Sequence, residues 1–150
     1  MLYLHEQHKD LFSVPSEYVL AHCISADFAL GAGIARQFQY RYQTRSELKQ
    51  LFPHYHFTGG DCILTGTKQT RMVYNLVTKA RYWEKPTYET LKQALENLYM
   101  MMVVGNQHRL AIPRIGCGLD RLNWEQVLEI IKKVFDRPGM YNIEILVCYQ

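Results

Sequence analysis

Short runs of apolar residues recur along the chain and are bounded by polar or glycine-containing segments. Runs of about four to eight such residues are typical of strands buried on both faces of a sheet. The run at 18–23, Tyr-Val-Leu-Ala-His-Cys, is a clear example. Together these runs predict strands at 2–5, 18–23, 62–65, 72–78, 109–112 and 143–148, with 2–5 as a short edge strand.

The segments between these runs repeat their apolar residues with a helical period. An apolar stripe at 91–102 predicts a helix that begins at Pro86 and ends near Val104. A second stripe at 127–134 predicts another helix, with Asn123 as its N-cap. Two shorter helices are predicted to end near residues 42 and 52.

Strands and helices therefore alternate along the whole chain. Alternation with apolar strands favours an α/β sandwich with a mixed sheet. At 150 residues the chain has the length of one domain with a sizeable core, and no repeat, linker or low-complexity segment divides it. We expect residues 1–150 to form a single α/β domain.

The composition is that of a soluble globular protein, with 48% hydrophobic and 21% charged residues. No apolar run approaches the length of about 20 residues that a membrane helix needs, and the N-terminus lacks the features of a signal peptide. The four cysteines are far apart, which indicates reduced thiols rather than a disulfide framework. We expect a cytoplasmic monomer that does not contact a membrane.

Two glycine-containing loops each follow a predicted strand and precede a predicted helix. The first glycine loop is Gly-Ala-Gly at 31–33, and the second glycine loop is Gly-Cys-Gly at 116–118. Glycine permits positive φ and a close approach of backbone N–H groups, and a helix N-terminus favours an anion. If the two strands are neighbours, the loops face one cleft and could hold a diphosphate. Neither loop is a complete dinucleotide or Walker motif, so two tight connections without a ligand are the alternative.

The small positive net charge of the chain is consistent with an anionic ligand, and the distribution of its basic residues argues against an extended nucleic-acid interface. The formal net charge is +3, and the basic residues are scattered. A nucleic-acid face usually concentrates lysine and arginine on one surface or along one helix. A small anionic ligand needs no such patch.

Five segments occur in an order that identifies a family. The segment 113–125, Pro-Arg-Ile-Gly-Cys-Gly-Leu-Asp-Arg-Leu-Asn-Trp-Glu, is long and highly specific. It is preceded by the shorter segments 21–27, 31–35, 76–79 and 85–89. Together they closely resemble the macro domain family, and within it the branch that contains terminal ADP-ribose protein glycohydrolase. The resemblance covers about residues 3–147 and implies a three-layer α/β/α sandwich with a mixed central sheet and ADP-ribose bound in a cleft at the strand ends, without a cofactor.

The resemblance also implies a set of ligand-binding residues. Asp10 matches the acidic residue that recognises the adenine amino group, although this chain has Lys9 where the family usually has glycine. Without the resemblance, Asp10 is a turn residue. Ser25 lies near the position that faces the distal ribose in this branch. The implied ADP-ribose-binding residues are Asp10, Leu11, Ser25, Gly31, Ala32, Gly33, Ile34, Ile115, Gly116, Cys117, Gly118 and Leu119.

The chemistry implied by the resemblance depends on Lys79 and Asp120. Lys79 would attack the anomeric carbon of the distal ribose, displace an acyl group such as a protein glutamate, and form a lysyl-ADP-ribose adduct. Asp120 would act as general acid and base and resolve that adduct. An amine attacks only in its neutral form, which burial favours, so Asp120 must serve proton transfer more than charge pairing. Without the resemblance, Lys79 is a solvated strand end and Asp120 a loop residue paired with Arg121.

Three further features support weaker hypotheses. His54 and His56 have i, i+2 spacing without other ligands beside them, so we expect no metal site. Cys117 could be a nucleophile, because a helix N-terminus lowers the pKa of a thiol, but no histidine lies in an evident partnering position. His22 lies on an apolar strand and is expected to be a core or cleft-wall histidine rather than a base.

Tyr82 and Trp83 follow Lys79 in a loop. They could line the mouth of the substrate site or pack against the helix at 87–104. We favour packing against the helix.

The sequence therefore predicts an ADP-ribosyl glycohydrolase that deacylates O-acyl-ADP-ribose and removes mono-ADP-ribose from glutamate side chains. The expected ligands are ADP-ribose, ADP-ribosylated protein and O-acyl-ADP-ribose. One alternative is a reader module that binds ADP-ribose without turnover, which the presence of both Lys79 and Asp120 argues against. Another is an antitoxin-like enzyme that acts on ADP-ribosylated DNA, which the modest charge disfavours.

Overall fold

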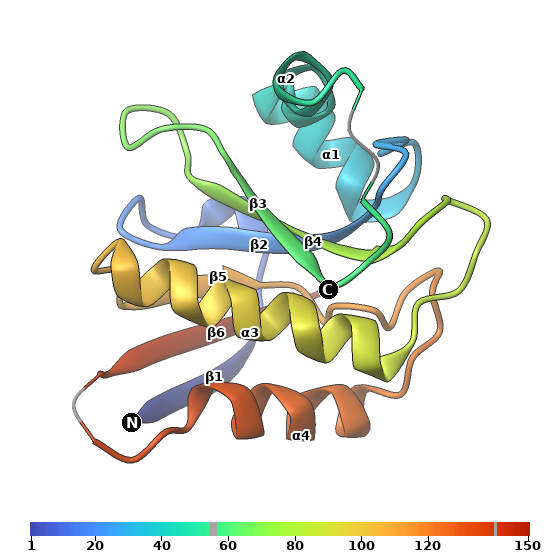
Figure 1. Cartoon of the computed structure of the whole chain (residues 1–150). Helices are drawn as coiled ribbons and strands as arrows, with labels where there is room; N and C mark the ends of the chain where they lie inside the picture. Colours follow the sequence, from blue (N-terminus) through green and yellow to red (C-terminus); the bar gives the residue numbers. More distant parts are fainter. Residues whose placement is uncertain (55–56, 140) are drawn as a thin grey trace.

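The computed structural model describes residues 1–54, 57–139 and 141–150 of the chain (Figure 1). In chain order, the elements within these residues are β1 (Leu2–His8), the short 3-10 helix η1 (Leu11–Ser13), β2 (Val19–Ser25), α1 (Gly33–Tyr42), α2 (Thr44–Leu51), β3 (Asp61–Thr65), β4 (Val73–Lys79), α3 (Tyr88–Val104), β5 (Arg109–Ile112), α4 (Trp124–Phe135) and β6 (Ile143–Tyr149). Every predicted strand and helix is present, with ends that differ by a few residues. The short helix η1 has no counterpart in the prediction.

The strands form one sheet in the order β1-β6-β5-β2-β4-β3. Neighbouring strands are parallel except β3, which runs antiparallel to β4. The sheet is therefore mixed, as predicted. β1 lies at one edge, also as predicted, but it pairs with β6 up to His8 and is longer than the expected strand at 2–5.

Helices cover both faces of the sheet, which gives the three-layer sandwich expected from the sequence (Figure 1). α3 and α4 lie on one face, and α1 and α2 lie on the other. The alternation of side chains along β4 fills both interfaces, because adjacent strand residues point to opposite faces. Leu76 belongs to the core cluster beneath α3 and α4, whereas Val77 belongs to the cluster beneath α2.

The N-termini of α3 and α4 are fixed by side-chain caps. Thr87 caps α3 and exchanges hydrogen bonds with Thr90, so the helix begins at Tyr88 and not at Pro86. Asn123 caps α4 by accepting a hydrogen bond from the backbone N–H of Gln126, as predicted. Each such cap contributes about 1 kcal/mol. No helix in the described ranges is long and apolar enough to cross a membrane.

Candidate active site

A cleft of about 790 Å³ is lined by the segments that follow β2, β4 and β5. In the sheet, β2 lies between β5 and β4, and all three strands are parallel. Their carboxyl ends therefore meet at the same edge of the sheet, which is where open α/β sheets bind ligands. The first and second glycine loops both contribute to the lining. The prediction that they face one cleft is confirmed.

The two glycine loops approach each other closely across this cleft. Gly33 and Gly116 have φ values of +58° and +73°, a conformation that favours glycine. A Cβ atom on Gly33 would lie 3.7 Å from Cδ1 of Leu119, which follows the second glycine loop. The Leu119 side chain therefore lies close to the backbone of the first glycine loop.

The N-terminus of α1 lies at the same cleft. Ala32 occupies the N-cap position in an extended conformation, and its methyl side chain cannot cap the helix. The first N–H groups of a helix have no partner within the helix and carry the positive end of the helix dipole. Because Ala32, Gly33 and Ile34 line the cleft, this end of α1 is suited to hold a phosphate group.

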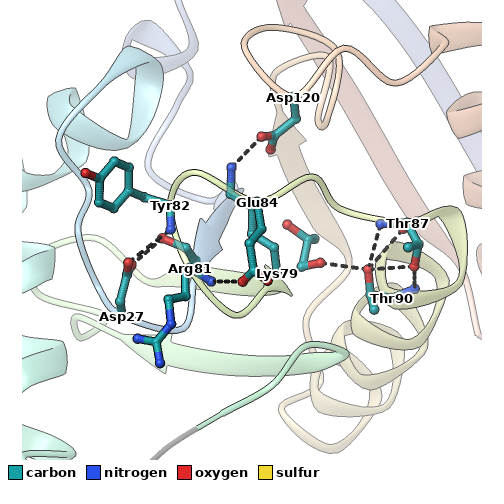
Figure 2. A network of polar contacts seen from close by, with 10 residues as sticks. Asp27, Lys79, Arg81, Tyr82, Glu84, Thr87, Thr90 and Asp120 are labelled. Atoms are coloured by element: carbon teal, nitrogen blue, oxygen red, sulfur yellow. Dashed lines mark hydrogen bonds and ion pairs between the residues drawn. The ribbon is translucent and has the colours of Figure 1, made fainter.

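Lys79 and Asp120 form an ion pair inside the cleft (Figure 2). The Lys79 Nζ atom lies 2.5 Å from Asp120 Oδ1, and the two side chains are only 14% and 18% exposed. Lys79 is the last residue of β4, where a register shift in the pairing with β2 sets it opposite Ser25. The described residues show no pairing of Asp120 with Arg121. The juxtaposition expected of the two residues is therefore present, and their catalytic roles remain predictions.

The end of β4 is also attached to the start of α3. The Thr90 hydroxyl donates a hydrogen bond to the backbone carbonyl of Thr78, at 2.7 Å (Figure 2). The same hydroxyl takes part in the cap at Thr87. The cap of α3 thus fixes the residue next to Lys79.

Asp27 connects two loops of the site, and the sequence analysis did not identify it. Its Oδ1 atom accepts hydrogen bonds from the Ser25 hydroxyl at 2.5 Å and from the Ala29 N–H at 3.1 Å. Its Oδ2 atom accepts one from the backbone N–H of Tyr82 at 3.0 Å. Burial raises the pKa of Asp27, but these hydrogen bonds outweigh it and hold the pKa below its ordinary value. The Ser-x-Asp pattern directly after an apolar strand was the available signal, because such residues often hydrogen-bond to nearby turns.

The expectation that Tyr82 and Trp83 pack against the helix at 87–104 is wrong. The two residues are 63% and 65% exposed, and both line the cleft. The inner face of α3 is already filled by its own apolar stripe, including the fully buried Leu91 and Leu95. The N–H of Tyr82 is instead bound to Asp27, on the loop that follows β2.

Most of the residues implied for ADP-ribose binding line the cleft, and three do not. Asp10 accepts a hydrogen bond from the N–H of Phe12 and caps η1, which is the turn role. Leu11 is buried, and the Cys117 thiol donates to the backbone carbonyl of Ile115. Ligand contacts by these three residues remain predictions. The lining includes Ser25, Gly31, Ala32, Gly33, Ile34, Ile115, Gly116, Gly118 and Leu119.

His22 is a core residue, in agreement with the structural interpretation of the sequence. It is fully buried, its ring stacks on Phe38 with centroids 3.8 Å apart, and its Nε2 lies 2.6 Å from Asn75 Oδ1. Burial lowers the pKa of His22 to about 4. The ring is therefore neutral at physiological pH and lies outside the cleft lining.

The thiols near the cleft are protonated at neutral pH. Burial, with a smaller contribution from Asp120, raises the pKa of Cys23 to about 12. Burial also raises the pKa of Cys117. Since the thiolate is the reactive form, the site does not favour a cysteine nucleophile.

The described ranges contain no cluster of three or more histidine, cysteine, aspartate or glutamate residues that could hold a metal ion. His56, which was considered with His54 as a metal-ligand pair, lies outside the described residues.

Comparisons with known proteins agree with this architecture. The Macro domain family model matches residues 21–131. ADP-ribose glycohydrolase OARD1 from Homo sapiens is 40% identical over 127 residues, which cover 85% of this chain and 80% of that protein, and the Bos taurus protein gives the same values.

Solved structures share the fold at lower sequence identity. The macrodomain of Thermus aquaticus DarG has a TM-score of 0.85 at 19% identity and covers 99% of both chains. Thermosipho africanus DarTG in complex with ADP-ribose has a TM-score of 0.80 at 16% identity, over 97% of this chain and 41% of that one. With a family match over most of its length and a close relative of similar size, the chain belongs to the macro domain family.

Proposed function

We propose that the protein is an ADP-ribosyl glycohydrolase that releases ADP-ribose from ester linkages, both in O-acyl-ADP-ribose and on glutamate side chains of proteins. The observation that carries the proposal is the Lys79–Asp120 pair, with 2.5 Å between Nζ and Oδ1, inside a cleft suited to a diphosphate. The 40% identical relative is named an ADP-ribose glycohydrolase, which supports the proposal. A protein of the same fold that was solved in complex with ADP-ribose also supports it.

The ligand is oriented by the two glycine loops and the N-terminus of α1. In this arrangement their backbone N–H groups hold the diphosphate. The distal ribose then lies over the ends of β2 and β4, with its anomeric carbon beside Lys79. Ser25, which is opposite Lys79 in the strand pairing, borders the same position.

The first chemical step needs a neutral amine. The Lys79 ammonium transfers a proton to Asp120, directly along their hydrogen bond. The amine then attacks the anomeric carbon, a C–N bond forms, and the C–O bond to the acyl group breaks. The carboxylate leaves with the electron pair of that bond.

The second step hydrolyses the adduct and restores the ion pair. Asp120 first gives its proton to the departing carboxylate. As a carboxylate again, it removes a proton from the water molecule that attacks the anomeric carbon. The C–N bond breaks, the amine of Lys79 takes that proton back, and ADP-ribose is released.

The test measures ADP-ribose release from O-acetyl-ADP-ribose and from a glutamate-ADP-ribosylated protein. We expect both Lys79→Ala and Lys79→Arg to lower kcat by about 1,000-fold or more while ADP-ribose still binds, because arginine keeps the charge but is not a nucleophile. Asp120→Ala is expected to accumulate the lysyl adduct, visible as an added mass of one ADP-ribose on the intact protein. Lys92→Ala, on the exposed face of α3, is the matched control and should remain active.

Turnover that persists in Lys79→Ala would contradict the lysine mechanism. If the wild type binds ADP-ribose but releases none from an ester, a protein or DNA, the domain is a reader module. Release from ADP-ribosylated DNA alone would support the antitoxin-like alternative.

A further inference from the structure

Tyr82 and Trp83 form an exposed aromatic pair at the mouth of the cleft. They are 63% and 65% exposed and both line the cleft, and adjacent exposed aromatic residues of this size often mark an interaction site. Their ring centroids are 5.0 Å apart, and the ring planes are almost perpendicular, at 89°. The two rings therefore do not form one flat surface.

The 80–85 loop that carries the aromatic pair is held in place by two carboxylates. Asp27 accepts a hydrogen bond from the N–H of Tyr82 at 3.0 Å, and Glu84 accepts one from the N–H of Arg81 at 2.7 Å (Figure 2). The N–H of Glu84 also closes a turn onto the carbonyl of Arg81. Exposed aromatic rings on a fixed loop bind a partner with little loss of conformational entropy.

The 80–85 loop directly follows Lys79 and lines the same cleft. In the proposed function, the glycine loops bind the ADP-ribose moiety and Lys79 marks the bond that breaks. The loop then borders the group that leaves. We propose that Tyr82 and Trp83 bind the polypeptide that carries the ADP-ribose and select protein-linked esters over small acyl esters. This inference depends on the proposed function for the identity of the reaction.

The charges on the 80–85 loop suit an acidic polypeptide. Arg81 directly precedes the aromatic pair, and Glu84 and Lys85 follow it. The Glu84 carboxylate is bound to the backbone N–H of Arg81, whereas the side chains of Arg81 and Lys85 form no ion pair within the described residues. Acidic residues next to a modified glutamate would meet these two cations. Aromatic residues and arginine are also the residues that dominate protein–protein binding energy.

The ring geometry favours a polypeptide over single-stranded nucleic acid. Successive bases stack on aromatic faces that lie free along a strand. Here the two rings meet edge to face, and the Arg81 guanidinium lies 5.8 Å from the centroid of the Trp83 ring. The pair therefore lacks two parallel free faces for neighbouring bases.

The experiment compares two substrates that share the same ADP-ribosyl ester. One is O-acetyl-ADP-ribose, and the other is an acidic peptide with ADP-ribose on a central glutamate. For Tyr82→Ala combined with Trp83→Ala, we expect the ratio of kcat/KM, peptide over O-acetyl ester, to fall about tenfold, mainly through KM for the peptide. Tyr3→Ala removes another exposed tyrosine, on β1 at the edge of the sheet, and should leave the ratio unchanged.

An unchanged kcat/KM ratio in the double variant would overturn the proposal. Equal losses on both substrates would mean that the aromatic pair contacts the ADP-ribose moiety, which both substrates share. A loss confined to an ADP-ribosylated single-stranded oligonucleotide would also overturn it. If the wild type turns over neither ester, the proposed function fails, yet the aromatic pair is still testable by binding. The modified peptide should then bind the wild type about tenfold more tightly than free ADP-ribose, and the double variant should lose that difference.

Discussion

The carboxylate of Asp27 accepts a hydrogen bond from the backbone N–H of Tyr82, at 3.0 Å, and joins the loop after β2 to the loop after β4. Its other oxygen accepts from the Ser25 hydroxyl, at 2.5 Å. The backbone carbonyl of Lys79 is bonded to the N–H of Ala26 in the same region, at 2.9 Å. We therefore propose that Asp27 is a positioning residue, which acts on Lys79 through the backbone that holds it.

We predict that Asp27→Asn lowers kcat/KM for O-acetyl-ADP-ribose by about tenfold and the free energy of unfolding by about 1–3 kcal/mol. An amide keeps one acceptor oxygen but replaces the other with an NH2 group. One of the present donors, the Ser25 hydroxyl or the Tyr82 N–H, would then face a donor. Steady-state kinetics and urea unfolding measure the two effects.

Asp136→Asn is the matched control for this prediction. Asp136 also accepts a backbone hydrogen bond, from Leu2 at 3.3 Å, but it follows α4 and is absent from the cleft lining. Its substitution should leave kcat/KM unchanged. Equal decreases of kcat/KM in both variants would show that Asp27 has no specific effect on the site.

Gly116 and Gly118, both in the second glycine loop, differ in backbone conformation and in the space available for a side chain. Gly116 has φ of +73°, and a Cβ atom there would lie 2.8 Å from Cδ1 of Leu122. Left-handed φ costs a residue with a side chain about 1–2 kcal/mol. We predict that Gly116→Ala lowers the free energy of unfolding by at least about that amount and weakens ADP-ribose binding, as calorimetry would show.

Gly118→Ala provides the contrast, measured by stability alone. A Cβ atom on Gly118 meets nothing within 4 Å, and its φ lies outside the left-handed region. The Gly118→Ala substitution should therefore change the free energy of unfolding of the protein by less than about 0.5 kcal/mol. Similar destabilisation in both variants would show that backbone conformation does not distinguish the two glycines.

The order of strands and helices could be predicted because periodicity is local. The apolar stripe that became the buried face of α3 and the apolar run 110–112 of β5 are both visible in short windows. The position of β3 at the edge of the sheet could not be predicted, because it depends on which strands pair with β2 and β4, which a local pattern does not show. The start of α3 was placed two residues early, because the mutual bonds of Thr87 and Thr90 outweighed the preference for proline at a helix start.

The site was predicted only as far as its motifs reach. The resemblance paired Lys79 with Asp120, which lie 41 residues apart in the sequence and 2.5 Å apart in space. The register shift that sets Lys79 opposite Ser25 has no local signature. The exposure of Tyr82 was also missed, because it depends on a hydrogen bond to a carboxylate 55 residues earlier.

His22 gives the core a measurable dependence on pH. Asn75 uses its NH2 group on three oxygens of β3 and β4, including the Ile63 carbonyl at 2.9 Å, so its oxygen accepts from Nε2–H of His22. The other ring nitrogen, Nδ1, is buried and has no hydrogen-bond partner within the described residues. A proton on Nδ1 would therefore be both charged and unsatisfied, and burial lowers the pKa of His22 to about 4.

We predict that the free energy of unfolding falls as pH decreases from about 6.5 to about 4, the interval between the unfolded and folded pKa values of His22. Between these pKa values the unfolded chain binds a proton at His22 that the folded chain does not. The stability that the neutral His22 provides is therefore fully present above pH 6.5, and about 3 kcal/mol of it is lost by about pH 4. His22→Gln keeps a donor for Asn75 without a titrating group, and it should remove this part of the slope in urea unfolding between pH 7 and pH 4. His5→Gln, on exposed β1, should keep the wild-type slope. A slope that survives in His22→Gln would show that the dependence arises from other groups.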